Sequence, residues 1–256
     1  MKQQTYVGYH SIAAILKRDG TSGTLYIHGA GARTDELRKI ADAAGVSVVE
    51  VDQRRIARLG GAAARNAVLV ASVAGGPRLP LNEALRRLTE RPAGAQEART
   101  GDVARVVLAL DHITDPQNLG AILRSADQFA VDLVLVPGRR SAPLSDAVMR
   151  ASAGAAATVP VVEVGNLAQA LTRLKDEGFW IYGADMDGAP VDRERLSGRV
   201  VLVLGSEGGG LSKLVRDRCD VMVRIPTGGS IDSLNVSVSA GIFLYEITRQ
   251  QQRFRS

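Results

Sequence analysis

The sequence predicts an α/β protein in two parts, a small mixed α/β domain followed by a larger domain with a parallel sheet. Residues 1–75 alternate short strand and helix patterns, and Pro, Gly and charged residues break every periodicity across residues 76–104. From Arg105 on, apolar runs of strand length alternate with helical stretches, which is typical of a parallel sheet with helices on both faces. We therefore expect domains at residues 1–75 and 105–256, joined by a linker at 76–104.

Apolar periodicity predicts the elements of the first domain and of the linker. Helices are expected at Ser11–Lys17 and Asp35–Ala44, strands at Thr24–Ile27, Val46–Val51 and Ala67–Val73, and a short linker helix at Leu81–Leu88. Together these elements form a compact α/β module and a helix-containing linker.

Near-continuous apolar runs predict the sheet of the second domain. The expected strands are Val106–Leu110, Leu133–Val136, Val159–Val162, Trp180–Ala184, Val200–Leu204 and Val221–Ile225. The alanine-rich segment Ala151–Ala157 is expected to be a tightly packed helix end or turn. Because such sheets bind ligands at the carboxyl ends of their strands, we expect the functional residues in the loops that follow these runs.

Composition excludes several classes of protein. With 256 residues, 45% of them hydrophobic and 23% charged, the chain has the composition of a globular protein with a sizeable core. It contains neither an apolar run long enough for a membrane span nor a secretory signal after Met1, so we expect a cytoplasmic location. One cysteine, Cys219, and three scattered histidines provide neither a disulfide framework nor a zinc site, so no metal is expected.

Excess positive charge is confined to the first third of the chain. Residues 1–90 hold 13 Lys and Arg against 8 Asp and Glu, whereas residues 91–256 hold 19 against 19. Most of the early cations are arginines, which bind phosphates bidentately and stack on bases. On charge alone, a polyanion-binding surface and a solvated basic face are equally supported.

The first informative loop runs from Asp111 to Arg124, after the first strand of the larger domain. Pro116 disfavours a helix before it, and Asn118 is predicted to be the N-cap of the helix that follows. Arg124 lies beside the apolar side of that helix, where an arginine commonly meets an anion. An interface ion pair and a functional role are equally supported by this segment. The apolar side consists of Leu119, Ile122, Leu123, Ala126 and Phe129.

The second loop is glycine-rich and runs from Gly205 to Leu211, directly after the strand Val200–Leu204. Its glycines let the backbone approach a ligand closely. Because the carboxylate of Glu207 inside the loop repels phosphates, we expect a neutral or cationic ligand. The loop lacks the Gly-Lys-Ser/Thr of a phosphate-binding loop and does not open the fold as a dinucleotide fingerprint does.

The third loop, Ile225–Gly241, begins where the last strand ends and leads into a final helix that extends to about Gln250. Ser233 and Asn235 are expected to start that helix, and each of these polar residues alone is better explained by helix capping than by catalysis. Three small residues on one side of the helix suit close contact with another backbone. They are Ser237, Ala240 and Gly241.

Taken together, the three loops resemble, in order and spacing, the motifs of the SpoU (TrmH-like) family of SPOUT RNA 2′-O-ribose methyltransferases. The resemblance covers residues 105–256 and implies a domain whose C-terminal part is threaded into a deep trefoil knot. The first domain, with Tyr6–His10 near its start, looks like the L30e-like RNA-binding domain of the family's ribosomal members, above all the RlmB type. Members of that type methylate a guanosine ribose of 23S rRNA, so the resemblance implies this substrate. Family members work as homodimers, so it also implies a homodimer.

The resemblance also implies roles for individual residues. S-adenosylmethionine is expected at the carboxyl ends of the strands, and Asn118, Ser233 and Asn235 are expected to position ribose and phosphate. Glu207 is expected to orient Arg124 or the glycine loop. The family proposal casts Arg124 as the activating group. Because a guanidinium is not deprotonated in proteins, we instead expect Arg124 to bind a phosphate and stabilise alkoxide charge. The cofactor candidates are Gly183, Ala184, Leu204, Gly205, Ile225 and Leu234, and the candidates for RNA contacts are Arg54, Arg55, Arg58 and Arg65.

Three alternatives remain open at this stage. The enzyme could methylate another nucleotide, either a 23S rRNA adenosine or a tRNA guanosine. An RNA-binding ribosome assembly factor without activity is a second possibility. A dinucleotide-dependent oxidoreductase rests only on the partial fingerprint Gly29–Thr34. Cys219 lies beside acidic residues that raise the pKa of a thiol, so a nucleophilic role is not expected.

Overall fold

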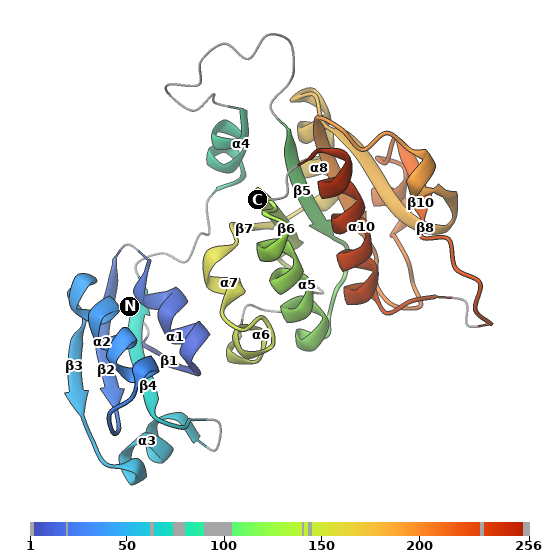
Figure 1. Cartoon of the computed structure of the whole chain (residues 1–256). Coiled ribbons are helices and arrows are strands. Elements are labelled where there is room, and N and C mark those ends of the chain that lie inside the picture. The colour runs from blue at the N-terminus through green and yellow to red at the C-terminus, as the bar shows by residue number, and fades with distance from the viewer. Residues whose placement is uncertain are drawn as a thin grey trace. The chain divides into compact units, whose positions relative to one another are not determined.

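The chain forms two compact units, each with its own sheet (Figure 1). The computed structural model describes residues 3–18, 20–61, 64–73, 80–89, 104–139, 141–142, 145–230 and 233–252. Unit 1 comprises Met1–Pro77 and Leu144–Thr158, and unit 2 comprises Arg78–Pro143 and Val159–Ser256. Of the predicted linker, residues 76–79 and 90–103 lie outside the described residues.

Unit 1 contains a mixed sheet with the strand order β1-β4-β2-β3. Strand β2 pairs in parallel with β3 and antiparallel with β4, and β1 pairs antiparallel with β4. Its elements are β1 (Gln4–Val7), α1 (Tyr9–Leu16), β2 (Thr21–Ile27), α2 (Ala32–Ala43), β3 (Ser47–Glu50), α3 (Gln53–Gly60), β4 (Ala67–Val73), α6 (Asp146–Ala151) and α7 (Ala155–Thr158). Strand β1 and helix α3 were not predicted, because β1 has only 4 residues and α3 buries only Ile56.

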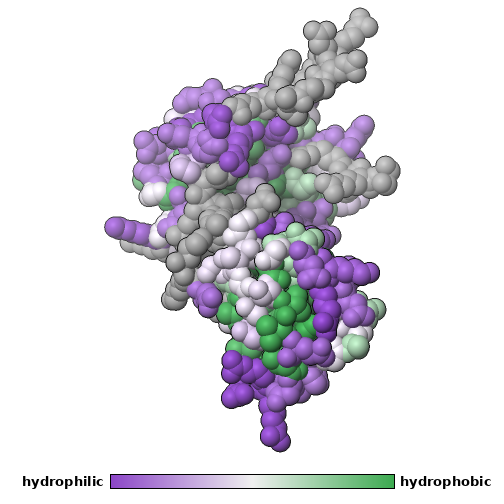
Figure 2. Space-filling view, turned by 90° about the vertical axis from the view of Figure 1, so that its left-hand side faces the viewer, coloured by the Kyte–Doolittle hydropathy of each residue, from purple (hydrophilic) through white to green (hydrophobic). Residues whose placement is uncertain are grey.

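The two faces of this sheet are covered unequally. On one face, α1 and α2 bury a cluster that includes Ile12, Leu25, Leu37 and Leu69. On the other, Ile56 of α3 is the largest buried side chain of a small cluster that leaves several apolar side chains only partly buried. Figure 2 shows hydrophobic residues gathered at the surface in the lower part of the view, bordered by hydrophilic ones.

Unit 2 contains a sheet with the strand order β10-β8-β9-β5-β6-β7, in which every pairing is parallel. Its elements are α4 (Leu81–Thr89), β5 (Arg105–Leu110), α5 (Pro116–Gln128), β6 (Leu133–Pro137), β7 (Val161–Val164), α8 (Leu167–Asp176), β8 (Trp180–Pro190), the 3₁₀ helix Val191–Arg193, β9 (Arg199–Leu204), α9 (Lys213–Arg216), β10 (Val221–Arg224) and α10 (Val236–Gln250). The predicted parallel α/β sheet is confirmed. The trefoil knot stays a prediction.

Both faces of this parallel sheet are buried, as its continuous apolar strands indicate. Val107 and Ala109 of β5 belong to a core cluster with Leu171 and Leu174 of α8. The alternate residues of β5 are equally buried, with Leu108 0% exposed. On unit 2, Figure 1 shows α5 and α10 side by side, and residues of α10 contact both α5 and β9.

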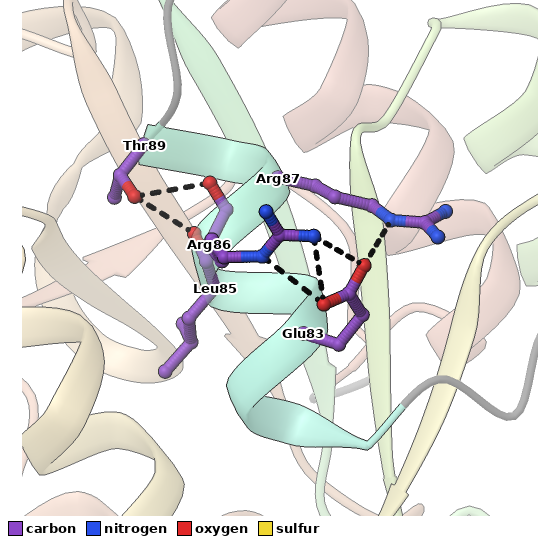
Figure 3. Close-up of polar contacts among 5 residues, drawn as sticks. All are labelled: Glu83, Leu85, Arg86, Arg87 and Thr89. Atoms are coloured by element: carbon purple, nitrogen blue, oxygen red, sulfur yellow. Dashed lines mark hydrogen bonds and ion pairs between the residues drawn. The ribbon is translucent and has the colours of Figure 1, made fainter.

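Helix α4 confirms the helix expected in the linker, and it belongs to unit 2. Its apolar residues Ala84, Leu85 and Leu88 join the core cluster of that unit. On its exposed side, Glu83 accepts hydrogen bonds from Arg86 and Arg87, one turn further along the helix (Figure 3). Hydrogen bonds from Arg86 come first among the causes that lower the pKa of Glu83. Such exposed pairs contribute little to stability, so burial of the apolar side holds α4 in place.

Helices in the described ranges are all too short or too polar to cross a bilayer.

Candidate active site

The three loops singled out in the sequence begin at the same edge of the unit 2 sheet. Strands β5 and β9 are parallel neighbours, and Leu110 pairs with Leu204 at their carboxyl ends. The loop after β5 leads into α5, and the loop after β9 is the glycine-rich segment. Because both loops start from paired residues, their side chains can meet although they lie far apart in the sequence.

A hydrogen-bonded cluster joins one residue from each of the three loops. The Asn118 Nδ2 atom donates to Glu207 Oε1 at 3.1 Å. The Asn235 Nδ2 atom donates to Asn118 Oδ1 at 3.0 Å and to Glu207 Oε1 at 2.6 Å. Asn118 is buried, whereas Glu207 and Asn235 are exposed. We call these three residues the amide–carboxylate cluster. It shows that the three predicted motifs form one site.

Asn118 was predicted to be the N-cap of α5, and that prediction is wrong. The N-cap is Asp115, whose Oδ1 accepts a hydrogen bond from the Gln117 backbone N at 3.0 Å. Pro116 occupies the first helical position, where its missing N–H and fixed φ are well suited. Asn118 therefore lies inside the first turn of the helix. Its amide is not used for capping and bonds to Glu207 and Asn235 instead.

Asn235 caps α10 and also belongs to the amide–carboxylate cluster. It is the N-cap of α10, because its Oδ1 accepts from the backbone N of Ser237 at 2.9 Å. At the same time its Nδ2 donates into the amide–carboxylate cluster. With the amide oxygen and nitrogen both engaged, the orientation of this side chain is fixed by the start of α10.

Arg124 and Ser233 do not join the cluster. Arg124 is exposed on α5, and among the described residues its guanidinium has neither an ion pair nor a hydrogen bond. It follows Asn118 by six residues, which places it about 9 Å further along the helix and roughly 240° around it. Glu207 accepts hydrogen bonds from Asn118 and Asn235, and its expected role in orienting Arg124 or the glycine-rich loop stays a prediction. Ser233 is exposed before α10.

The glycine-rich loop is a tight, defined turn. Ser206 and Gly210 exchange backbone hydrogen bonds of 3.1 and 3.0 Å, which close its base. A Cβ atom at Gly205 would lie 2.2 Å from the carbonyl carbon of Gly210, so only glycine fits there. Gly208 adopts a left-handed φ of 77°, which also favours glycine. The glycines thus bring Glu207 to the tip of a closed turn.

The other expected cofactor residues differ in position and exposure: Leu204 ends β9, Ile225 follows β10, Gly183 and Ala184 lie within β8, and Leu234 lies before α10. Leu204 is buried, Ile225 and Ala184 are half-buried, and Leu234 is 38% exposed. At Gly183, a Cβ atom would lie 2.7 Å from Cys219 Sγ, so contacts inside the protein already require glycine at this position. Leu234 is therefore the one large apolar side chain of this set that is presented to solvent.

Cys219 is an unreactive thiol, as expected, but mainly for a different reason. Burial comes first among the causes that raise the pKa of Cys219 to about 12, and Asp220 adds to it. The sequence indicated only the acidic neighbours. The thiol is therefore protonated throughout the physiological pH range and does not serve as a nucleophile.

The four arginines expected to contact RNA all lie in unit 1. Arg54, Arg55 and Arg58 are exposed on α3, and Arg65 is exposed between α3 and β4. Asp52 caps α3 by accepting a hydrogen bond from the Arg55 backbone N at 2.7 Å. The helix therefore presents three cations to solvent.

Fold and site together define an α/β protein with its ligand site at the carboxyl edge of a parallel sheet. The model of the SpoU rRNA Methylase family matches residues 105–245, which include all three loops. The chain belongs to the SpoU rRNA methylase family.

Similar proteins extend over the whole chain. The 23S rRNA (guanosine-2′-O-)-methyltransferase RlmB of Ralstonia nicotianae is 35% identical over 98% of this chain and 97% of its own length. The protein of the same name from Vibrio cholerae is 34% identical over 100% of both chains.

Solved structures show the same fold. The SpoU methyltransferase AviRb from Streptomyces viridochromogenes, in complex with the cofactor AdoMet, has a TM-score of 0.74 at 22% identity and covers 98% of this chain and 92% of its own. An RNA 2′-O ribose methyltransferase has a TM-score of 0.74 at 25% identity and covers 97% of this chain and 88% of its own.

Replacing Gly205 by Ala is expected to destabilise the protein, because the new Cβ collides with the backbone of Gly210. Overpacking of this kind costs about 1–3 kcal/mol. The measurement is the free energy of unfolding in urea. Gly165→Ala is the matched control, since a Cβ there has no atom within 4 Å. Equal stability of the two variants would show that the loop yields to the added methyl group.

Proposed function

We propose that this chain is an S-adenosylmethionine-dependent RNA 2′-O-ribose methyltransferase whose target is a guanosine of 23S rRNA. The amide–carboxylate cluster carries this proposal, because it joins in one site the three loops that lie within the family match. Full-length relatives named as 23S rRNA guanosine-2′-O-methyltransferases support the substrate.

The residues present fit S-adenosylmethionine. This cofactor carries a flat adenine and a positive sulfonium but no phosphate, so it needs apolar contact and backbone hydrogen bonds rather than a phosphate-binding loop. The exposed Leu234, the half-buried Ile225 and the glycine-rich backbone after Leu204 offer these contacts. The carboxylate of Glu207 is compatible with a cation. When bound, the cofactor supplies an activated methyl group.

The chain's own residues then hold the ribose and its phosphate. A ribose hydroxyl is a poor nucleophile, so it must be held in line and must lose its proton as the new C–O bond forms. We assign positioning to Asn118, Asn235 and Ser233 at the carboxyl ends of the strands. Glu207 keeps both amides oriented through its hydrogen bonds.

Arg124 supplies the charge stabilisation in this proposal. Its guanidinium is exposed and has no protein partner among the described residues, so it is available for a phosphate of the RNA. A guanidinium stays protonated, and it therefore stabilises negative charge on the ribose oxygen instead of removing the proton. The proton passes to solvent or to another group of the complex.

We also propose a homodimer through α10. Val238, Ile242 and Tyr245 are 50%, 38% and 51% exposed and recur at helical spacing on one side of α10. Exposed apolar patches of this kind mark interaction surfaces. The small residues of the helix point elsewhere, since Ala240 is buried and a Cβ at Gly241 would lie 3.8 Å from Ser125 of α5. We therefore base the dimer on the exposed apolar side of α10 rather than on its small residues.

The decisive experiment incubates the purified chain and S-adenosylmethionine with 23S rRNA transcribed without modifications and, in a separate reaction, with unmodified tRNA. We expect a single ribose methylation at a guanosine, which resists alkaline cleavage. Methylation of a 23S rRNA adenosine or a tRNA guanosine would support the alternative targets. Binding of the RNA with no transfer would support a ribosome assembly factor. The cytoplasmic location that we propose follows from this substrate.

Arg124→Lys is expected to lower the rate of methyl transfer by a factor of about 100 or more, as typically follows removal of a charge-stabilising donor. The charge is kept, but the planar fork that grips a phosphate is lost. Single-turnover kinetics measure the rate, with Arg173→Lys on α8 as the control. A near-wild-type rate for Arg124→Lys would contradict any need for the guanidinium.

Replacing Arg54, Arg55 or Arg58 singly by Gln is expected to weaken binding to a 23S rRNA fragment in a salt-dependent way. The logarithm of the association constant falls as the logarithm of the salt concentration rises, and each lost phosphate contact makes this slope less steep by about 0.7–0.9. The control is Arg38→Gln in the same unit, because Arg38 is paired with Glu50. An unchanged slope in all three variants would assign these arginines to a solvated basic face.

Ile242→Lys is expected to convert the dimer to a monomer, because it places a charge in the apolar surface of α10. The molar mass in solution, measured by light scattering, falls by half. Met186→Lys is the control, since Met186 is similarly exposed at 52% but lies on β8. A wild-type protein that is monomeric at micromolar concentration would refute the proposed dimer.

A further inference from the structure

Asp111 is a buried carboxylate that the proposed mechanism does not use. It follows β5 directly and is only 1% exposed. Its Oδ2 accepts a hydrogen bond from the backbone N of Ser212 at 2.7 Å, across 101 positions of sequence. Its Oδ1 lies 2.7 Å from Nδ1 of His112. Both carboxylate oxygens therefore have partners, as a buried charge requires.

Asp111 contacts both ends of the glycine-rich loop. Its backbone N donates to the carbonyl oxygen of Leu204 at 2.8 Å, at the point where the loop leaves β9. Its side chain binds the backbone N of Ser212, at the point where the loop ends and α9 begins. The segment between these two contacts contains Glu207. One residue thus fixes the span of the turn that carries a member of the amide–carboxylate cluster.

The His112 ring contacts the second oxygen of the same carboxylate, Oδ1 of Asp111. His112 adopts a φ of 60°, which is uncommon for a residue other than glycine. Such a conformation persists only where surrounding contacts hold it, and here the His112 ring turns back onto Asp111. His112 also opens the loop into α5, which carries Asn118. The carboxylate therefore links the starts of two of the three loops.

We propose that Asp111 is a positioning residue that sets the glycine-rich loop relative to β5, and through it the place of Glu207 between Asn118 and Asn235. This inference rests on the proposed function for its activity readouts. Its structural readout does not, because hydrogen exchange of the loop amides is measured without cofactor or RNA.

Two substitutions remove the hydrogen bond between Asp111 and Ser212, and two keep it. Asp111→Ala removes the acceptor, whereas Asp111→Asn keeps one carbonyl oxygen for the Ser212 N–H. Ser212→Pro removes the donor and leaves Asp111 in place, and the φ of Ser212, −61°, already suits proline. Ser212→Ala is its matched control, because it keeps the N–H and removes only the hydroxyl.

Asp132→Ala is a second control, because Asp132 directly precedes β6 and its side chain bonds to the other end of β5. The Oδ2 of Asp132 accepts from the backbone N of Val106 at 2.8 Å, near the amino end of β5 and away from the site. It loses the same kind of bond as Asp111→Ala does. Any effect common to both variants therefore reports general stability, and any effect confined to Asp111 reports loop position.

The first readout is amide hydrogen exchange of residues 205–211 in the full chain. We expect exchange at least tenfold faster in Asp111→Ala and Ser212→Pro, because a hydrogen bond to a buried charged group is lost. Asp111→Asn, Ser212→Ala and Asp132→Ala are expected to keep the wild-type rate there within about threefold.

The second readout is the affinity for S-adenosylmethionine by calorimetry, together with the single-turnover rate. Both are expected to fall about tenfold in Asp111→Ala and Ser212→Pro, and Asp111→Asn is expected to restore them in large part.

Wild-type exchange in the loop of a folded Ser212→Pro or Asp111→Ala protein would overturn the proposal. If Asp111→Ala does not fold, Ser212→Pro decides. Faster exchange together with unchanged affinity and rate would equally overturn the positioning role, since the loop would then move without consequence. A wild-type chain that neither binds the cofactor nor transfers methyl would refute the proposed function, and the exchange result would still test the contact of Asp111 with the loop.

Discussion

The parallel pairing of β5 with β9 is the constraint on which the site depends. Leu110 and Leu204 are partners at the carboxyl ends of these strands, so two loops that are almost a hundred positions apart start side by side. Because parallel strands require a crossover on a face of the sheet, the pairing also commits helices to both faces. The apolar character of both strands, buried on both faces, sets this arrangement.

The side-chain amides of Asn118 and Asn235 make the cluster polar, and their hydrogen bonds also fix its geometry. Asn118 and Asn235 each use a donor and an acceptor, and Glu207 accepts from both. A network whose members are paired is rigid, whereas unpaired buried polar groups are costly. The cluster therefore orders the edge of the sheet and leaves Arg124 outside it with its charge available.

Much of the fold was predictable because apolar runs report burial directly. Strand β4 was predicted at its observed bounds, and β9 and β10 within one residue. Strand β1 and helix α3 were missed, since one is very short and the other buries a single side chain. Asn118 was misplaced as a cap because Asp115 and Asn118 are both good N-caps, and sequence preference alone does not choose between them. Asp111 carried no signal beyond an acid directly after a buried strand.

By itself, the sequence determined the parallel α/β class of unit 2, the three loops that matter and the residue types in them, because periodicity and glycine usage are local properties of a chain. Only the tertiary structure decided which residues meet. Hydrogen bonds between Asn118, Glu207 and Asn235, and the contact of Asp111 with Ser212, join positions far apart in sequence through strand register. No local pattern encodes such register, since it emerges from the burial of the whole sheet.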